Sequence, residues 1–252
     1  VPYKAQSKGN GPAAQADAKQ GYFRGNLRSE LENRVDGLSD RWDTFADSWC
    51  SLEQDYFMGD GGHYRYRRYA VFQAGQDGCL SQLDEQKHYQ SVAYNQLNGG
   101  MYRQYPCFET TTLTNPVFEA LLDYTLHSVN EARNDVPSWR FEAHQFRILA
   151  GLREVGKPVP EGIHQDGVDY VFIFMVKREN VRGGVSRVYK PDGHLMTEMK
   201  LRSPLDFMVV NDRRVLHYVT PIHARNLREE AYRDVLVITV KADTQAMVGR
   251  AA

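Results

Sequence analysis

The sequence is poor in cysteine and in long hydrophobic runs, and each shortage excludes a class of protein. Its three cysteines, Cys50, Cys79 and Cys107, are far apart and form no CxxC pattern. Such spacing argues against a disulfide framework or a structural zinc site and favours reduced thiols, so we expect a cytoplasmic protein. No apolar run reaches the roughly 18 residues that cross a bilayer, and the first twenty residues lack the apolar segment of a signal peptide. We therefore expect no membrane partner.

The sequence also has little net charge. Its formal charge of -1 gives the whole molecule no field that would attract nucleic acid or an acidic membrane. Basic residues gather between 177 and 190, but such a cluster is more often the solvated face of a hairpin than a binding patch. We expect no nucleic-acid partner, and nothing in the composition indicates an oligomeric state.

The composition itself is that of a globular protein, with 42% hydrophobic, 12% aromatic and 25% charged residues. A chain of 252 residues can bury one sizeable core, so a single domain is the simplest expectation. Residues 1 to 20 have almost no large apolar side chains, which predicts a flexible N-terminal tail. The single domain is then expected over residues 21 to 252.

Helical patterns come first along the chain and strand patterns follow. Apolar residues recur at helical spacing from Asn26 to Phe57 and again after Asn115-Pro116, where the asparagine suits a cap and the proline suits the first turn. Most later segments have strand character and are bounded by Gly, Pro, Asn or Asp. This order predicts a mainly β fold, a small antiparallel barrel or sandwich with flanking helices. The expected strands are 64–73, 140–149, 163–176, 185–189, 195–201, 206–210, 215–222 and 232–241.

Three residues have the types and the spacing of a metal site. If 163–176 is a strand, His164 and Asp166 point to the same face, because residues i and i+2 of a strand do so, and both side chains can then reach one ion. His217 follows on a later strand. An isolated His-x-Asp pair occurs often by chance. Two histidines and one carboxylate on one face of a metal, however, are the ligand set of non-haem Fe(II) oxygenases.

The motifs around these residues resemble the catalytic half of the 2-oxoglutarate/Fe(II) dioxygenases. Three segments, residues 142–147, 182–184 and 211–217, resemble one branch in particular. That branch contains bacterial L-isoleucine 4-hydroxylase, related free amino-acid dioxygenases, and biofilm- and stress-associated relatives. The resemblance covers about residues 140 to 242. It implies a double-stranded β-helix (jelly-roll, cupin-like) core and an enzyme that uses Fe(II), 2-oxoglutarate and dioxygen.

The same resemblance implies roles for individual residues. His164, Asp166 and His217 match the metal ligands, and Arg233 matches the arginine that pairs with the distal carboxylate of 2-oxoglutarate. The chain departs from the pattern after Arg233, since many members place Ser or Thr two residues later, where this chain has valine. The spacing from the distal histidine to Arg233 is also longer than usual. Arg225 or Arg228, in the inserted loop, therefore stays open as the anchor.

Two polar residues on the strand before the ligand pair complete the expected site. Related enzymes place residues that touch 2-oxoglutarate or substrate there, so we expect Gln145 to contact the cosubstrate and Arg147 to contact the substrate. The alternative is that His144 and Phe146 face inward, because the pattern of this strand does not decide which face is inside.

The resemblance implies a free aliphatic or sulfur-containing L-amino acid as the substrate, hydroxylated on its side chain. Asp169 or Glu142 would then hold the substrate ammonium group. A larger substrate, such as a peptide or a modified base, is the competing interpretation. Two other classes also stay open: a cupin-type metalloenzyme that does not use 2-oxoglutarate, and a non-catalytic metal-binding protein of the biofilm or stress response.

Overall fold

Two strands rich in apolar residues, β8 (Tyr170–Glu179) and β15 (Tyr232–Ala242), lie side by side in the main sheet. The structure is a computed structural model that describes residues 11–75, 78–84 and 87–243. Within these residues the main sheet is antiparallel, in the order β1-β12-β8-β15-β7-β3-β2, and β4 pairs with β3. The remaining strands of this sheet are β1 (Tyr22–Asn26), β2 (Glu53–Gln54), β3 (Arg65–Gly75), β4 (Leu80–Leu83), β7 (Ser138–Leu149) and β12 (Asp206–Asn211).

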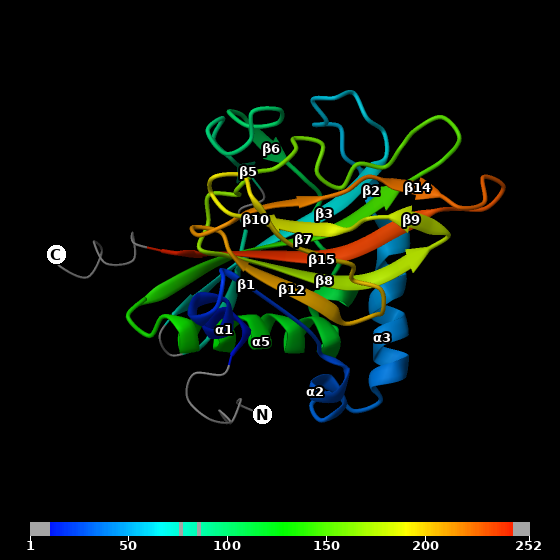
Figure 1. The fold of residues 1–252 in the computed structure, drawn as a ribbon. Coiled ribbons are helices and arrows are strands. Elements are labelled where there is room, and N and C mark those ends of the chain that lie inside the picture. The colour runs from blue at the N-terminus through cyan, green and yellow to red at the C-terminus, as the bar shows by residue number, and fades with distance from the viewer. Residues whose placement is uncertain (1–10, 76–77, 85–86, 244–252) are drawn as a thin grey trace.

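Three smaller sheets lie on one side of the main sheet, and the helices lie on the other (Figure 1). The prediction of a mainly β fold with flanking helices and a double-stranded β-helix core is confirmed. The smaller sheets consist of β10 (Ser186–Tyr189) between β11 (Leu195–Met199) and β13 (Leu216–Val219), of β9 (Val181–Gly183) with β14 (Ile222–Ala224), and of the hairpin β5 (Lys87–Tyr89) with β6 (Tyr102–Gln104).

The longest helix, α5 (Pro116–Ala132), begins as its sequence predicts. The side chain of Asn115 accepts a hydrogen bond from the backbone N–H of Val117 at 2.9 Å, and Pro116 occupies the first turn, where its missing N–H costs nothing. The helical pattern over residues 26–57 forms two helices and a 3-10 turn. The further helices are α1 (Pro12–Ala18), α2 (Arg28–Glu32), α3 (Leu38–Asp47), η1 (Ser48–Ser51) and α4 (Thr110–Leu113).

The prediction of a tail over residues 1 to 20 is wrong for residues 12–18, which form α1. The small side chains of Ala13 and Ala16 are fully buried, and the backbone N–H of Ala13 donates to Ser128 Oγ on α5 at 2.8 Å. Small residues allow this close packing of α1 against α5. The sequence did not predict the helix, because the segment has no large apolar side chains that would indicate burial. Residues 1–10 lie outside the described residues.

The alternation of side chains divides the main sheet into a helix-facing side and a sandwich-facing side. On β8, Phe172 and Phe174 pack into the core beneath the helices, whereas Val171, Ile173 and Met175 pack into the space between the sheets. All five are nearly or fully buried. Because both faces of β8 are covered, its sequence is a continuous apolar run rather than an alternating one.

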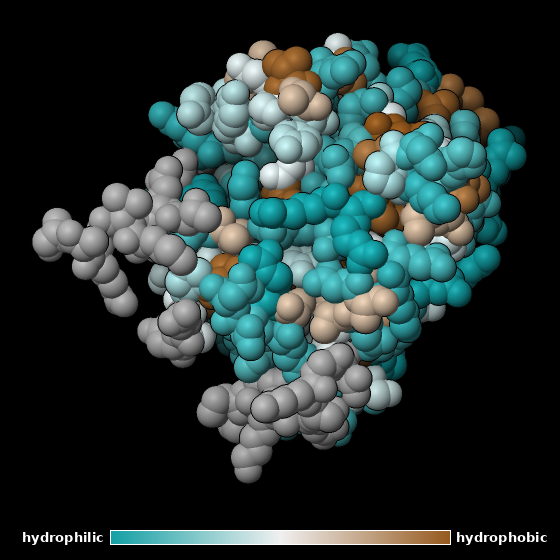
Figure 2. Space-filling view, turned by 60° about the vertical axis from the view of Figure 1, so that its left-hand side comes forward, coloured by the Kyte–Doolittle hydropathy of each residue, from teal (hydrophilic) through white to brown (hydrophobic). Residues whose placement is uncertain are grey.

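Two of the expected strands differ from the structure. The segment predicted as a strand over 163–176 becomes regular only at Tyr170, and the segment over 215–222 divides into β13 and β14 at Thr220-Pro221. Proline explains the second break, since it has no N–H to donate to a strand ladder. No described helix is both long enough and apolar enough to cross a membrane. Figure 2 shows a mostly hydrophilic face on which hydrophobic patches are small and scattered.

Candidate active site

A cavity of about 610 Å³ lies between the main sheet and the smaller sheets. The sandwich-facing side chains of β3, β7, β8 and β15 form its floor, and the loop before β8, together with β13, forms one wall. The hairpin β5–β6 contributes further side chains to the lining. The cavity therefore receives residues from both halves of the chain.

His164, Asp166 and His217 meet at this cavity. One ligand atom from each lies within 4.8 Å of the others. Asp166 sits between the rings, with its Oδ1 3.5 Å from His164 Nε2 and its Oδ2 3.3 Å from His217 Nε2. The backbones of the two histidines pair directly, because each N–H donates to the other's carbonyl, at 3.1 and 2.9 Å. The structure thus brings together the three residues that the spacing selected.

The local structure that aims these side chains is a loop rather than the expected strand. His164 makes an isolated β-bridge to His217, and Gly167 adopts a φ of +80°, which turns the chain between Asp166 and β8. The carboxylate of Asp212 accepts backbone N–H groups from Asp166, Gly167 and Val168, at 3.0, 2.8 and 3.1 Å. Asp212 therefore fixes the path of the loop that carries Asp166.

Asp212 also lies 3.2 Å from His217 Nε2, so it contacts two parts of the histidine-aspartate cluster. In the sequence, the segment around Asp212 indicated only a family resemblance and no role for this residue. An aspartate five residues before the distal histidine, directly after a strand, was the signal that could have identified it.

The cluster is strongly polarised. Burial favours the neutral form of Asp166, but the adjacent imidazoles hold the pKa of its carboxyl well below the usual value. Burial likewise disfavours a charge on His217, yet Asp166 and Asp212 raise the pKa of its ring to about 10. The pKa of His164 is also raised, by Asp166, against the effects of burial and of His217. The cluster is therefore an anionic carboxylate that attracts positive charge on both sides.

This donor set fits a divalent iron ion. Two imidazole nitrogens and one carboxylate oxygen would hold one face of such an ion and leave its other positions for further ligands. A bound metal ion would take the place of the ring protons on the ligand nitrogens of the two histidines. Their ring centroids are 4.4 Å apart.

Arg233 projects into the same cavity from β15. It is 2% exposed, and its Nε and Nη2 atoms have no hydrogen-bond partner among the described residues. Burial, together with the nearby Arg178, lowers the pKa of the Arg233 guanidinium to about 9. Arg225 and Arg228 are exposed and do not line the cavity. Of the three arginines considered from the sequence, Arg233 is the one at the cavity.

The structure does not place Gln145 and Arg147 at the cavity, which corrects the roles expected for them. Gln145 Nε2 donates to Ser48 Oγ at 2.8 Å on the helix-facing side, and Arg147 forms a two-pronged pair with Asp234 at 2.7–2.8 Å. His144 and Phe146 line the cavity instead. The reason is the register of β7, since neighbouring residues of a strand face opposite sides.

The cavity lining contains two polar residues that the sequence did not indicate, and one of the two acidic residues that it did. His88 and Arg103, on β5 and β6, both line it. Glu142 faces the cavity from β7. Asp169 does not: its carboxylate accepts the backbone N–H of Ala242 at 2.8 Å, away from the cavity lining. Strands of three residues carry no periodicity, so the sequence could not predict the hairpin.

The fold and this cavity agree with comparisons to known proteins. The model of the 2OG-Fe dioxygenase family matches residues 46–239, and the chain belongs to that family. Its metal is therefore Fe(II) and its cosubstrate 2-oxoglutarate, which confirms the predicted enzyme class and disfavours both a non-catalytic protein and a cupin-type enzyme without 2-oxoglutarate.

Relatives support the branch that the sequence resembles. The chain is 28% identical over 228 residues to 3(1)-hydroxy-L-isoleucine 4-dioxygenase of Pantoea ananatis (89% of this chain and 90% of the relative) and 24% identical over 198 residues to L-isoleucine-4-hydroxylase of Bacillus thuringiensis (76% and 79%). The crystal structure of a bsmA homolog from Methylobium petroleophilum PM1 superposes with a TM-score of 0.82 at 31% identity, covering 96% of this chain and 94% of that one.

Proposed function

We propose that this protein hydroxylates the side chain of a free aliphatic or sulfur-containing L-amino acid, with His164, Asp166 and His217 as the iron ligands and Arg233 as the 2-oxoglutarate anchor. The observation that carries the site assignment is the convergence of the histidine-aspartate cluster and an unpaired buried guanidinium on one cavity. The substrate class is supported by the isoleucine-oxidising activities that give two relatives their names.

The protein residues hold, orient and shield the reactants. Iron and 2-oxoglutarate, when bound, supply the chemistry that places oxygen on an unactivated C–H bond. The cluster gives the metal two neutral donors and one anionic donor, and Asp212 keeps the aspartate loop in position. Arg233 offers two parallel N–H donors to a carboxylate in a buried setting, where such a pair is strong and selective.

The cavity has both an apolar and a polar region, as an amino-acid substrate requires. Ile173, Val235 and Val237 form a buried or half-buried hydrophobic floor that suits an aliphatic side chain and keeps water away from the reacting carbon. Glu142 and Arg103 lie in the same lining and could meet charged groups. A substrate held at its polar end therefore presents its hydrocarbon part to the metal.

The test is a screen of succinate release with Fe(II), ascorbate, 2-oxoglutarate and each of the twenty amino acids, followed by mass spectrometry. We expect an aliphatic or sulfur-containing amino acid to stimulate decarboxylation and to gain one oxygen atom. If no free amino acid stimulates it while a peptide or a nucleic acid does, the substrate proposal fails and the family assignment stands. A cytoplasmic location and a link to biofilm or stress physiology stay predictions from the sequence.

A further inference from the structure

We propose that Arg103 binds the α-carboxylate of the substrate, and that Glu142 with His88 receives its ammonium group. This inference rests on the proposed function, and it assigns the polar end of the substrate to a group of residues on β5, β6 and β7. Four observations carry it: the direction of the hairpin, the free edge of Arg103, the balance of buried charge and the hydrogen bonds inside the group.

The hairpin β5–β6 places its two functional side chains over the cavity. His88 and Arg103 are direct partners across the two strands, so their side chains lie on the same face. Arg103 is 2% exposed and both residues line the cavity. Tyr89 and Tyr102, the next pair in register, are 49% and 67% exposed, and their rings, 5.0 Å apart, also belong to the cavity lining. The hairpin thus buries Arg103 at the cavity and leaves its aromatic pair largely exposed.

Arg103, like Arg233, has one edge of its guanidinium group without a hydrogen-bond partner among the described residues. Its Nε and Nη2 atoms, which form one side of the guanidinium plane, are buried without a hydrogen-bond partner among the described residues. Elsewhere in the chain this edge holds a carboxylate: Arg65 uses it to bind Asp55 and Arg147 uses it to bind Asp234. Within the described residues, Arg103 and Arg233 are the two arginines with both atoms buried and unpartnered. The cavity therefore presents two places for a carboxylate.

The buried charges beside Arg103 call for an anion. Asp55 lies 2.7 Å from Arg65 and 3.6 Å from Arg67, so one carboxylate serves two guanidinium groups. Arg103 has no carboxylate within ion-pair distance in the described part of the chain. A buried cation without an anion is costly. A bound carboxylate would offset that cost, and 2-oxoglutarate has its distal carboxylate assigned to Arg233.

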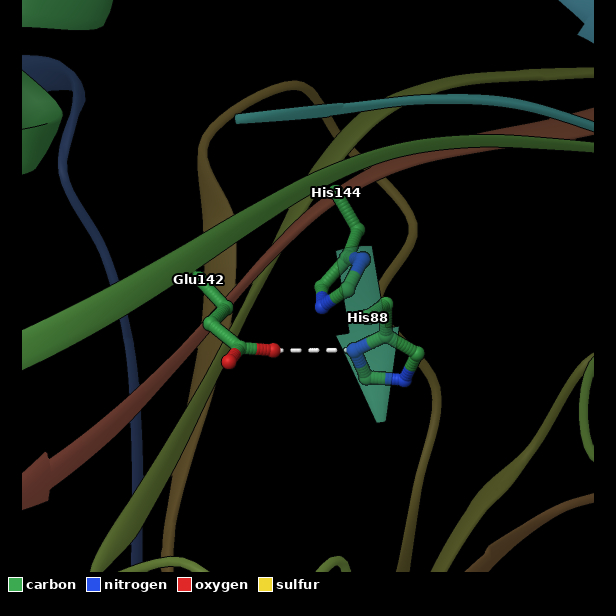
Figure 3. A group of neighbouring side chains, drawn as sticks. All are labelled: His88, Glu142 and His144. Carbon is green, nitrogen blue, oxygen red and sulfur yellow. Dashed lines mark hydrogen bonds and ion pairs between the residues drawn. The ribbon is translucent and has the colours of Figure 1, made fainter. Parts of the chain in front are cut away.

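His88, Glu142 and His144 form the second half of the proposed subsite (Figure 3). Glu142 Oε2 lies 2.9 Å from His88 Nδ1, and burial lowers the pKa of His88, while His88 and Arg140 hold the pKa of Glu142 below its usual value against the effect of burial. A neutral His88 donates from Nδ1 to the ionised Glu142, which leaves His88 Nε2 as an acceptor. The pair thus offers a negative charge and a lone pair, which suit an ammonium group.

The same three residues are spaced for a metal ion, but their surroundings oppose one. Arg67 Nη2 lies 2.6 Å from His144 Nδ1 and can only donate, so the proton of His144 is on Nε2. A protonated Nε2 is no metal ligand. Arg67, Arg103 and Arg140 also lie around the group, and they repel an uncompensated divalent cation. An amino acid is a zwitterion, which brings no net charge and can meet both signs.

The subsite is adjacent to the proposed iron site. Gln90, one residue after β5, donates from Nε2 to Asp166 Oδ1 at 3.1 Å. His144 is close enough to Asp166 for the aspartate charge to act on the pKa of its ring. A substrate held by its α-carbon groups at Arg103 and Glu142 would therefore extend its side chain toward the metal.

The decisive experiment compares isoleucine with its carboxamide in the wild type and in Arg103→Leu, with Arg182→Leu, an exposed arginine on β9, as the control. We expect Arg103→Leu to raise the KM for isoleucine by about 100-fold, the loss typical of a charge-assisted hydrogen-bonded pair. The KM for 2-oxoglutarate should not change. Wild type should discriminate against isoleucinamide, and Arg103→Leu should lose this discrimination. Arg103→Lys keeps the positive charge but loses the two parallel N–H donors of the guanidinium group, so its KM for isoleucine should lie between those of the wild type and Arg103→Leu.

Glu142→Gln tests the ammonium half of the subsite. This variant should raise the KM for isoleucine and lose discrimination against N-acetylisoleucine, which has no ammonium group. A Co(II) titration should give one ion per chain in the wild type and in His88→Ala. Two ions in the wild type and one in His88→Ala would identify a second metal site and overturn the inference.

The outcomes separate this inference from the proposed function. If the wild type oxidises no free amino acid, the proposed function fails. If the wild type oxidises isoleucine but Arg103→Leu leaves its KM unchanged, or raises the KM for 2-oxoglutarate instead, the subsite assignment is wrong. If Arg103→Leu does not fold, Arg103→Lys and the wild-type preference for isoleucine over its carboxamide still decide the matter.

Discussion

Carboxylates and guanidinium groups of the same residue type differ in this cavity and beside it according to the partners that the surrounding structure provides. Asp166 is an anion because imidazoles flank it, and Asp212 keeps it in place through the backbone of the loop. Arg147 is satisfied by Asp234, whereas Arg233 has a free edge. The same residue type is structural in one place and available for a ligand in the other.

The three proposed iron ligands should be individually indispensable. His164→Ala, Asp166→Ala and His217→Ala should each abolish Fe(II)-dependent succinate release, because the metal loses one of its protein donors. Circular dichroism should confirm that each variant is folded. Asp192→Ala, in an exposed turn, is the matched control. Succinate release at the wild-type rate by any one of the three would remove that residue from the site.

Arg233→Leu should act mainly on the cosubstrate. The change removes one partner of a buried charge-assisted pair, a loss of about 2–5 kcal/mol, so the KM for 2-oxoglutarate should rise at least tens of fold. Metal binding should persist, since the ligands are unchanged. Arg228→Leu is the control, and the kinetics of both variants should be measured at saturating amino acid. A cosubstrate defect that follows Arg228→Leu would place the anchor in the loop at 224–231.

At the residue scale, the sequence selected three candidate ligands that the structure brings together, but it did not settle which residues of a strand face the cavity. Few residue types bind Fe(II), so the His-x-Asp pair and the later histidine could be selected by type and spacing. Gln145 and Arg147 were placed on the wrong face because a shift of one residue exchanges the two faces of a strand. The sequence of β7 is equally compatible with their neighbours, His144 and Phe146, facing the cavity.

At the scale of elements, glycines with left-handed backbone conformations shape the turns around the cavity. Gly183 (φ +79°) ends β9, and Gly184 (φ +64°) follows it before β10. A Cβ at Gly183 would overlap the carbonyl oxygen of Pro221, and a Cβ at Gly184 would lie 3.2 Å from Arg233 Cδ. This turn therefore packs against Arg233, the proposed 2-oxoglutarate anchor.

Gly183→Ala should destabilise the protein by more than backbone strain alone. A left-handed conformation costs an L-residue about 1–2 kcal/mol, and the overlap with Pro221 adds to it. Gly193→Ala is a matched control, because Gly193 has a similar φ of +88° but open space around the added methyl group. Thermal unfolding should give a larger fall in Tm for Gly183→Ala. Equal falls in the two variants would show that the contact with Pro221 has no influence.

Element prediction was reliable for long segments and failed for short ones. The cap at Asn115 and the strands over 140–149 and 232–241 were expected close to where they lie, because their patterns extend over many residues. The hairpin β5–β6 and helix α1 were missed. A strand of three residues is too short to show a periodic pattern. The alanine-rich helix α1 is stabilised by a tertiary contact with α5, which cannot be predicted from the sequence of α1 alone.

At the scale of the whole molecule, the helical layer and the sheet share one core. Trp49, in η1, is 1% exposed, packs on Phe45 of α3, and donates a hydrogen bond from its indole to the carbonyl of Phe146 on β7 at 3.1 Å. Phe146 presents its side chain to the cavity on the other side of the same strand. The helices thus support the sheet directly behind the proposed site.

We expect residues 21–252 to unfold as one unit and Trp49→Ala to weaken the whole of it. Truncation of a buried tryptophan costs about 3–5 kcal/mol, which for a domain of this size lowers the Tm by roughly 10 °C. Calorimetry should show a single transition in both proteins. Tyr56→Ala, at an 82% exposed aromatic residue, is the control. Two separate transitions would contradict the single-domain prediction.

Because Arg103 and Arg233 both present to one cavity a guanidinium edge without a partner among the described residues, the cosubstrate can compete with the amino acid. 2-Oxoglutarate carries two carboxylates and the amino acid carries one, so cosubstrate in excess can also occupy the edge of Arg103. Excess cosubstrate then competes with the amino acid, and the rate should pass through a maximum as its concentration rises. The initial rate should therefore depend on the ratio of 2-oxoglutarate to amino acid, and a higher amino-acid concentration should move the maximum to a higher cosubstrate concentration.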